Sequence, residues 1–399
     1  MKLSVIIVSY NVRHYLQQCL DSLQRALKDI DAEICIIDNH SKDDTVAWLR
    51  KNNKTNIRLI ACNHNNGFAK ANNIGIKQTS GEYVLLLNPD TIVGENTIRE
   101  CLDFMDAHDN AGGLGVLMLK CDGDKALESR RGLPTPKTSF YKMCGLCAKY
   151  PNSKRFGKYY MCGMPWDKPG KIDVISGAFF MMRRTALNKA GLLDEDFFMY
   201  GEDIDLSYRL QKCGYDNWFL PVKILHYKGE STQKSSFRYV HVFYEAMLIF
   251  FSKHYGHLSF WLYIPIKTAI YLKATLALIK MLSGNIKKML GFPAKQKNRS
   301  QYYVFLGSSD SISKCKTIVE KHGLDAQYFI CDEKSNPQGH VKFIESLNSS
   351  SDIYAVYDTS SFKYETILDM FSKHNTENVL IGTYNPKTNV IITDKEIID

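Results

Sequence analysis

The first hundred residues alternate short runs of β-branched and aliphatic residues with longer amphipathic stretches. The apolar runs are "LSVIIVSY", "AEICIID", "NIRLIAC" and "EYVLLLN". Helical patterns occupy about Arg13 to Lys28, the stretch after Ser41, and about Lys70 to Gln78. This order predicts an α/β fold with a mostly parallel sheet and helices on both of its faces.

Polar segments follow each of the four predicted strands. They are "SYN" (9–11), "DNHSKDD" (38–44), "NHNNGFAKANN" (63–73) and "NPD" (88–90). Helix caps and turns would explain any one of them. Because ligands of parallel sheets bind at the carboxyl ends of strands, the four together predict a ligand-binding rim.

The net charge of +9 is unevenly distributed. Residues 257–299 hold eight basic residues and no acidic one, whereas residues 301–399 hold fourteen acidic and nine basic residues. We predict a catalytic domain over 1–255, a basic amphipathic linker over 256–299 and a small acidic α/β domain over 300–399. The last part has no G-x-G-x-x-G motif, so we expect it to bind a protein partner or to regulate rather than to bind a nucleotide.

Eleven cysteines occur in no regular spacing, and the amino terminus runs directly into a predicted strand without a signal-peptide pattern. Both features predict a reducing, cytoplasmic location with free thiols. Cys144 and Cys147 form a C-x-x-C motif with Cys162 nearby. No second pair follows, which favours unpaired thiols over a metal site.

The stretch "DEDFFMYGEDIDLSYRL" (194–210) concentrates carboxylates beside aromatic residues. Carboxylates near apolar surface have perturbed proton affinities and can take a proton from a hydroxyl group. Acidic residues also stabilise the amino terminus of a helix. Both interpretations stay open from this stretch alone.

Six segments in order resemble family 2 glycosyltransferases of the GT-A fold, in particular the rhamnosyltransferase-like branch. They are "VSYN", "DNHSKDD", "NNGFAKANNIG", "LNPDT", "SGAFFMMRR" and "DEDFFMYGEDIDLSYRL". The resemblance covers about residues 1–255. It implies the inverting transfer of a sugar from a nucleotide-diphosphate donor to a hydroxyl group.

The resemblance also implies a nucleotide site on the first three polar segments. Ser9, Tyr10 and Asn11 would line the base and ribose, and Asp38 with Asp43 would take their polar edges. The residues implied against the nucleotide sugar and diphosphate are Asn66, Gly67, Phe68, Ala69 and Asn72. Glycine there lets the backbone approach the ligand closely.

A departing diphosphate needs a positive group to stabilise its charge. The resemblance makes Asp90 the candidate ligand of a divalent metal, Mg²⁺ or Mn²⁺. Asn88 replaces the first carboxylate of the common D-x-D motif, so the diphosphate would hold the metal in part. His226 would complete the coordination or contact the diphosphate, although a lone histidine is often structural.

The family's general base matches Asp203, and Glu202 would orient the acceptor or the base. Gly177, with Ala178, matches the segment that lines the donor sugar and acceptor, with a plain core strand as the alternative. Arg130 and Arg131 could face a phosphate or lie in a solvated turn.

We expect rhamnose from its thymidine-diphosphate form as the donor sugar, with UDP-linked hexoses as the rival. The expected acceptor is a polyprenyl-diphosphate-linked glycan of cell-surface polysaccharide synthesis, and no nucleic-acid partner is expected. Residues 257–288 form an apolar stretch interrupted by lysines. This pattern favours a helix lying in the cytoplasmic face of the membrane over packing on the catalytic domain or a true span. The protein is therefore expected on the inner face of the cell membrane as a peripheral protein.

Three other functions fit the sequence less well. A sugar-nucleotide pyrophosphorylase would carry a Gly-rich loop after its first strand, which "VSYNVRHYL" lacks. A non-catalytic glycan-binding scaffold on the same fold would not need both Asp90 and Asp203. A processive synthase would carry a Q-x-x-R-W signature and several membrane spans, and neither is present in the sequence.

Overall fold

The structure is a computed structural model that describes residues 1–52, 55–227, 237–256, 300–344 and 351–399, together with Thr268, Tyr271, Thr275 and Ser283. The predicted linker over 256–299 and the membrane segment over 257–288 lie outside the described residues, apart from Gly256 and those four single positions.

The amino-terminal half of the first sheet is parallel, as predicted. Its strands are β1 (Leu3–Ser9), β2 (Ala32–Asp38), β3 (Ile57–Ala61) and β4 (Tyr83–Leu87), in the order β3-β2-β1-β4. The connecting helices are α1 (Arg13–Ala26), α2 (Thr45–Lys51) and α3 (Gly67–Lys77). Strands β1, β2 and β4 are largely buried on both faces, which explains their continuous apolar runs, whereas the edge strand β3 is partly exposed.

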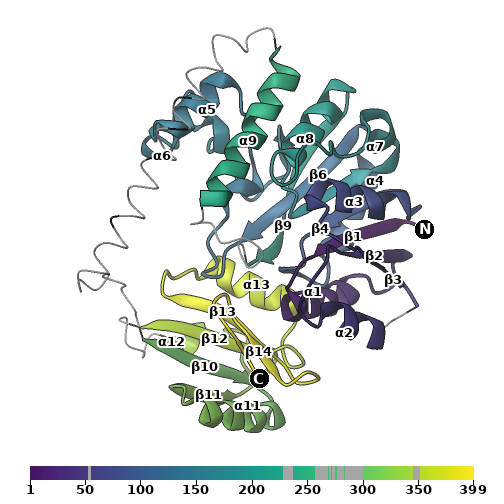
Figure 1. The fold of residues 1–399 in the computed structure, drawn as a ribbon. Helices are drawn as coiled ribbons and strands as arrows, with labels where there is room; N and C mark the ends of the chain where they lie inside the picture. The colour runs from purple at the N-terminus through teal and green to yellow at the C-terminus, as the bar shows by residue number, and fades with distance from the viewer. Residues whose placement is uncertain are drawn as a thin grey trace.

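The sheet continues beyond β4 with strands of both directions to a total of nine (Figure 1). They are β8 (Phe179–Arg183), β6 (Ala111–Leu119), β9 (Asp216–His226), β5 (Thr91–Val93) and β7 (Gly170–Ile172). The helices of this half are α4 (Thr97–Ala107), α7 (Arg184–Ala190), α8 (Glu202–Lys212) and α9 (Phe237–His254). Because β6 and β9 run parallel to β4, six of the nine strands share one direction. The α/β fold with a mostly parallel sheet is confirmed.

An insert of short helices interrupts the sheet between β6 and β7. It contains η1 (Leu127–Ser129), α5 (Pro136–Met143), α6 (Leu146–Lys149) and η2 (Gly157–Tyr160). Thr135 caps α5 by accepting a hydrogen bond from the Thr138 amide, and Pro136 begins the helix. Each helix has at most two turns, which is too short to give a clear period in the sequence.

The carboxyl-terminal part forms a second sheet of six strands. They are β11 (Ala326–Ile330), β10 (Gln301–Gly307), β12 (Asp352–Asp358), β13 (Val379–Asn385), β14 (Val390–Ile392) and β15 (Ile397–Ile398). Its helices are α11 (Ser309–His322), α12 (Val341–Ile344) and α13 (Tyr364–Lys373). The first four strands are parallel, and the antiparallel β14 and β15 add an edge to the predicted α/β domain.

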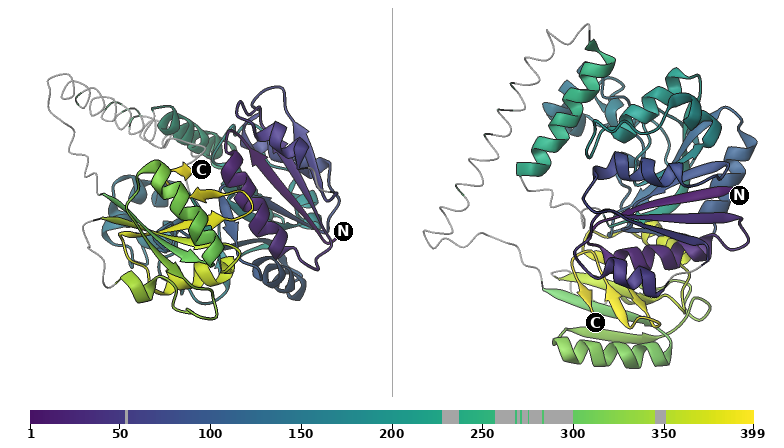
Figure 2. Two further views of the ribbon diagram at one scale, coloured as in Figure 1. Left: turned by 90° about the horizontal axis from the view of Figure 1, so that it is seen from below. Right: turned by 45° about the vertical axis from the view of Figure 1, so that its right-hand side comes forward.

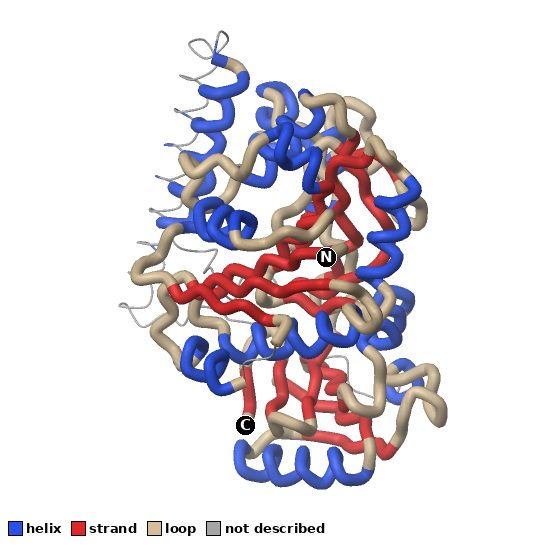
Figure 3. The backbone as a smooth tube through the Cα atoms, turned by 90° about the vertical axis from the view of Figure 1, so that its right-hand side faces the viewer, coloured by secondary structure: helices blue, strands red, loops and turns tan. Residues whose placement is uncertain are grey.

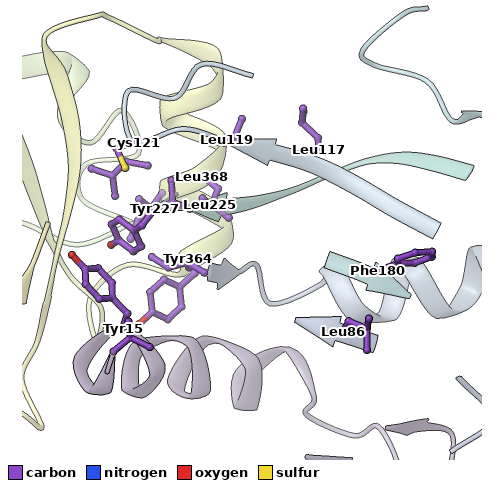
Figure 4. Close-up of a cluster of buried hydrophobic side chains, with 14 of the residues drawn as sticks. Tyr15, Leu86, Leu117, Leu119, Cys121, Phe180, Leu225, Tyr227, Tyr364 and Leu368 are labelled. Atoms are coloured by element: carbon purple, nitrogen blue, oxygen red, sulfur yellow. The ribbon is translucent and has the colours of Figure 1, made fainter. Parts of the chain in front are cut away.

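Helices α1 and α13 lie between the two sheets (Figures 2 and 3). The Arg25 guanidinium lies 4.8 Å from the centre of the Tyr364 ring, and the Tyr15 hydroxyl donates to the Thr393 carbonyl over 2.8 Å. Tyr15, Tyr227 and Tyr364 belong to one apolar cluster that reaches Leu86 and Phe180 of the first sheet (Figure 4). The two sheets therefore share a core. The division into domains and a protein-binding role for 300–399 stay predictions.

Among the described residues, no helix is long and apolar enough to cross a membrane. None of the eleven cysteines forms a disulfide within the described residues, including Cys144, Cys147 and Cys162.

Candidate active site

A pocket of about 270 Å³ opens at the carboxyl edge of the first sheet. Its walls come from the ends of β1, β4 and β9, the start of α3, the segment before β8 and the start of α8. The residues that line it are Val8, Tyr10, Asn39, Asn65, Gly67, Phe68, Asn88, Pro89, Asp90, Glu128, Arg131, Ser176, Gly177, Ala178, Met199, Tyr200, Glu202, Asp203 and His226. Nine of the predicted site residues are among them.

The three predicted residues at the end of β1 lie in different environments. Tyr10 lines the pocket, whereas Ser9 is buried. Asn11 has a positive φ of 54°, and its side-chain oxygen accepts a hydrogen bond from the Lys42 amide over 2.6 Å. Asn11 therefore ties the end of β1 to the loop after β2 and does not line the pocket.

Asp38 and Asp43 lie on the same rim beside the pocket. Asp38 is buried and accepts from the Ser41 amide over 2.9 Å. Asp43 accepts from the Thr45 amide over 3.2 Å and from the Thr45 hydroxyl over 2.6 Å, at the start of α2. Asp43 therefore closes a turn just before α2, whose N-cap is Asp44, and it also accepts from the Arg13 amide over 3.3 Å.

The loop before α3 is shaped by Asn39, which the sequence analysis did not assign. Its side chain donates to Asn65 Oδ1 over 2.9 Å and accepts from the Asn66 amide over 2.8 Å. Gly67 has φ +75°, and a Cβ there would come within 2.4 Å of the Phe198 carbonyl oxygen. Only glycine fits this approach. Asn39 lies within "DNHSKDD", so its position at a strand end was the available signal.

Two predicted residues of α3 point away from the ligand side. Ala69 is fully buried in the core of the sheet, and Asn72 is buried and donates to the Phe68 carbonyl over 2.9 Å. Neither lines the pocket. They fix the helix that carries Gly67 and Phe68.

Asn88, Asp90 and His226 come together although they are far apart in the sequence. The antiparallel pairing of β5 with β9 places Thr91 opposite His226, which brings the histidine beside the end of β4. His226 Nε2 lies 3.3 Å from Asp90 Oδ1 and 3.2 Å from Asn88 Nδ2. The Tyr227 amide donates to the Asp90 carbonyl over 3.0 Å, so the backbone also joins the two segments.

Asp203 stands in the first turn of α8, after a left-handed Gly201. Its Oδ2 accepts from Arg131 Nη2 over 2.5 Å and from the Gly177 amide over 3.2 Å. Its Oδ1 accepts from the Ile204 amide over 2.8 Å. Side-chain exposure is 13% for Arg131 and 14% for Asp203, so the pair is largely shielded from water.

Glu202 has a different environment from Asp203, although the two are adjacent. It is 5% exposed, and its Oε2 has no hydrogen-bond partner among the described residues. Burial, followed by repulsion from Asp203, raises the pKa of Glu202 to about 8. Near neutral pH the pocket therefore holds a protonated Glu202 beside an Asp203 that carries an arginine counter-charge.

The two neighbouring arginines differ sharply. Although burial opposes its charge, the Asp203 carboxylate raises the pKa of Arg131. Arg130 is fully buried, lies 3.4 Å from the Trp166 ring centre and donates to the Pro165 carbonyl over 2.9 Å. The expectation that Arg130 faces a phosphate or a solvated turn is wrong, because its planar group stacks inside the insert.

Three of the four remaining carboxylates of the acidic stretch contact α9, and the fourth, Glu195, accepts from Asn73 of α3 over 2.9 Å. Asp205 is buried, accepts from Arg209 Nε over 2.7 Å and lies 2.6 Å from His254 Nε2. Lys253 pairs with Asp194 and Asp196. The stretch therefore combines pocket residues with residues that attach α9 to α8.

Residues 4–191 match the family model described as glycosyl transferase family 2. This part of the chain belongs to that family. The chain therefore carries a family 2 glycosyltransferase domain, which acts on nucleotide-sugar donors.

Relatives of this glycosyltransferase come from bacteria and archaea. It is 28% identical over 268 residues to the N-acetylglucosaminyl-diphospho-decaprenol L-rhamnosyltransferase of Mycobacterium tuberculosis, covering 64% of this chain and 85% of that protein. It is 28% identical to the low-salt glycan biosynthesis hexosyltransferase Agl10 of Haloferax volcanii, covering 53% and 62%. A solved structure of a Pyrobaculum calidifontis mannosyltransferase with GDP-Man and Mn²⁺ matches 71% of this chain and 75% of its own at 16% identity and a TM-score of 0.45.

Proposed function

We propose that this glycosyltransferase moves a sugar, with rhamnose as the first candidate, to a hydroxyl group of a polyprenyl-diphosphate-linked glycan, with inversion at the anomeric carbon. The observation that carries the proposal is a single pocket that holds both Asp203, fixed by Arg131, and the Asn88–Asp90–His226 group. One inverting displacement needs a proton acceptor and a site for the diphosphate in the same cavity.

Asp203 acts as the general base. The acceptor oxygen attacks the anomeric carbon from the face opposite the diphosphate, a new carbon–oxygen bond forms, and the bond to the diphosphate oxygen breaks. The acceptor proton passes to Asp203, and the nucleoside diphosphate leaves. Arg131 and the Gly177 amide hold Asp203 Oδ2 in one orientation for this transfer.

Glu202 acts as a hydrogen-bond donor to a sugar hydroxyl. Glu202 lines the pocket, and one of its oxygens has no hydrogen-bond partner among the described residues. Its raised pKa of about 8 keeps the proton in place near neutral pH. The two adjacent carboxyl groups therefore have different roles, because Glu202 stays protonated while Asp203 accepts the acceptor proton.

The nucleotide is held along the rim that begins at Tyr10. Tyr10 and Asn39 line the pocket. Ser9, Asn11, Asp38 and Asp43 lie outside it at the ends of β1 and β2, where we place the base and ribose. Gly67 and Phe68 place the start of α3 against the diphosphate, with Asn66 in the adjoining loop.

A divalent metal fits the pair of Asp90 and His226. Within the described residues no cluster of three His, Cys, Asp or Glu side chains forms, so the donor diphosphate would supply further ligands. An imidazole nitrogen beside a carboxylate suits Mn²⁺ better than Mg²⁺, which prefers oxygen. When bound, the metal neutralises the charge that develops on the leaving diphosphate.

The mycobacterial relative supports the donor and acceptor, because its name specifies an L-rhamnosyl group and an N-acetylglucosaminyl-diphospho-decaprenol acceptor. We extend both to this chain, with the thymidine-diphosphate donor as the first choice and UDP-hexoses as the rival. A lipid-linked acceptor requires the enzyme at the inner membrane surface, and residues 257–288 are the proposed attachment.

The test is a transfer assay with the purified full chain, Mn²⁺ and polyprenyl-diphospho-N-acetylglucosamine. A panel of thymidine-, uridine- and guanosine-diphosphate sugars serves as donors. The proposal expects one donor to be used with inversion and the wrong-sugar donors to be rejected. Transfer only to water-soluble, lipid-free acceptors would contradict the lipid-linked assignment.

A further inference from the structure

The insert between β6 and β7 carries an unbalanced positive charge. From Ser129 to Trp166 there are eight arginine and lysine residues and no aspartate or glutamate. Two of the eight contact groups inside the protein, since Arg130 is buried and Arg131 pairs with Asp203. The exposed ones are Lys137, Lys149, Lys154, Arg155 and Lys158. None of these five forms an ion pair with a carboxylate of the described residues.

Aromatic side chains lie among these basic residues. Phe140 on α5 is 54% exposed, and Tyr150 after α6 is 45% exposed. The Phe156 ring centre lies 4.9 Å from that of Tyr141 and 5.9 Å from that of Tyr150. Phe140, Tyr141, Tyr150 and Phe156 thus form an aromatic cluster, and with the five exposed basic residues they make up what we call the basic-aromatic surface.

The basic-aromatic surface begins next to the active site. Arg131 contacts Asp203, and the next residue, Gly132, donates to the Tyr159 carbonyl over 2.9 Å. Only three residues separate Arg131 from Thr135, which caps α5. The basic-aromatic surface, which includes residues of α5 and α6, is therefore held close to the pocket by a short, hydrogen-bonded connection.

Apolar contacts join the insert to α9 as well. A small crevice between the insert and α9 is lined by Pro134, Tyr200, Ile204 and Phe250. Tyr200 also lines the active-site pocket. An apolar wall therefore runs from the pocket to the side of the molecule where the insert lies.

We propose that the basic-aromatic surface binds the anionic surface of a lipid bilayer and presents the pocket to a lipid-linked acceptor. The inference rests on the proposed function for its acceptor. Exposed rings beside lysines and arginines suit the interface between head groups and acyl chains, where both the rings and the cations are stabilised. A nucleic acid would also match the charge and could stack on the rings. We commit to the bilayer because the surface adjoins a pocket proposed to take a lipid-linked acceptor.

The test is sedimentation of the full chain with vesicles of phosphatidylcholine alone or mixed with phosphatidylglycerol. The variant Lys149→Glu/Lys154→Glu/Lys158→Glu reverses three charges of the surface. We expect it to lower partitioning onto the anionic vesicles by roughly 100-fold, since each basic residue near such a membrane contributes about a fivefold gain. Phe140→Ala/Tyr150→Ala should weaken binding to the same vesicles by about tenfold.

Matched controls distinguish the effect of where the substituted residues lie from the effect of the change in net charge. Lys316→Glu/Lys334→Glu/Lys387→Glu makes the same change in net charge on exposed lysines of the second sheet, and Ile330→Ala removes an exposed apolar side chain there. Both controls should partition like the wild type. The proposal is overturned if the surface variants still bind like the wild type, if both lysine variants lose binding equally, or if the protein binds polyphosphate but no vesicles.

Activity assays distinguish this inference from the proposed function. The surface variants should keep the wild-type rate of donor hydrolysis and lose transfer only when the acceptor is embedded in anionic vesicles. If the wild type transfers sugar to no lipid-linked acceptor, the proposed function fails, while the vesicle-binding comparison still decides whether the surface binds lipid.

Discussion

Arg131 Nη2 and Asp203 Oδ2 lie 2.5 Å apart in a pair that is almost closed to water. Breaking such a pair from one side leaves a buried charge without its partner. We expect Arg131→Met to lower the free energy of unfolding by about 3 to 5 kcal/mol and to lower turnover as well. The double variant Arg131→Met/Asp203→Asn should recover much of that stability in urea denaturation. Additive losses in the double variant would show that the two side chains do not interact.

Asp203→Asn should leave donor binding nearly unchanged and lower turnover by about 10²-fold or more. The amide has the same shape but cannot accept the acceptor proton. Steady-state kinetics with separate kcat and KM values give the measurement. Asp196→Asn is the matched control, because Asp196 belongs to the same acidic stretch but its side chain is 70% exposed and pairs with Lys253. Near-normal turnover in Asp203→Asn would remove Asp203 from the role of base.

Asp90→Ala and His226→Ala should each weaken metal-dependent donor binding by about tenfold or more. Titration of Mn²⁺ in the presence of nucleoside diphosphate measures the effect, and the binding step is followed without turnover. EDTA should abolish transfer by the wild type. Full activity in EDTA would contradict the metal assignment for both residues.

Glu202→Gln should change how stability depends on pH. The folded-state pKa of Glu202 is raised from 4.5 to about 8, so the folded protein keeps a proton that the unfolded chain releases. The wild type therefore loses stability as pH rises from 4.5 toward 8, by up to ~1.4 kcal/mol per pH unit. Glu202→Gln removes this loss, so its stability relative to the wild type should rise across that window in urea denaturation. Parallel curves for the two proteins would contradict the raised pKa.

Protonation of His340, which lies beside the second sheet, should lower the free energy of unfolding at acid pH. Burial lowers the pKa of His340 to about 3, and its Nδ1 lies 2.6 Å from the Tyr357 hydroxyl. Because the folded-state pKa is depressed, the stabilisation is complete above the unfolded pKa of 6.5 and is lost as pH falls toward 3. His340→Gln should reduce the loss of unfolding free energy as the pH falls. Denaturation at about pH 7 and about pH 5 tests it, with the exposed His322→Gln as control.

The parallel strands β1 to β4 could be predicted from the sequence because each is an apolar run followed by polar residues, whereas β6 and β9 of the same sheet were not predicted. The insert could not, since α5, α6 and the two 3₁₀ turns are too short to show a helical period. The antiparallel β14 and β15 were missed for a related reason, because two strands of three and two residues carry almost no pattern.

Within the candidate site, the order of motifs led to Asp90, Asp203 and His226, which the fold brings to one pocket. The sequence could not show that Arg131 would pair with Asp203, because 72 positions separate them. The segment before β8 joins them in the fold, since Val174 bridges Arg131 and the Gly177 amide donates to Asp203. Nor could it separate Gly67, which meets Phe198, from Ala69, which faces the core two residues later. Such distinctions depend on the direction of a side chain on a helix.

The contact of Tyr227 with Tyr15, at 5.1 Å between ring centres, bears on how the molecule unfolds. Tyr227 follows His226 directly, and its ring belongs to the apolar cluster that includes Tyr364 of the second sheet. Separating the sheets would expose that cluster to water beside the Asp90–His226 pair. The chain should therefore denature in a single cooperative transition. A protein cut before residue 300 would also lose the correct shape of the sheet edge that carries Asp90 and His226. The apolar cluster beside that edge, which includes Tyr227, would be exposed to water without the residues of the second sheet.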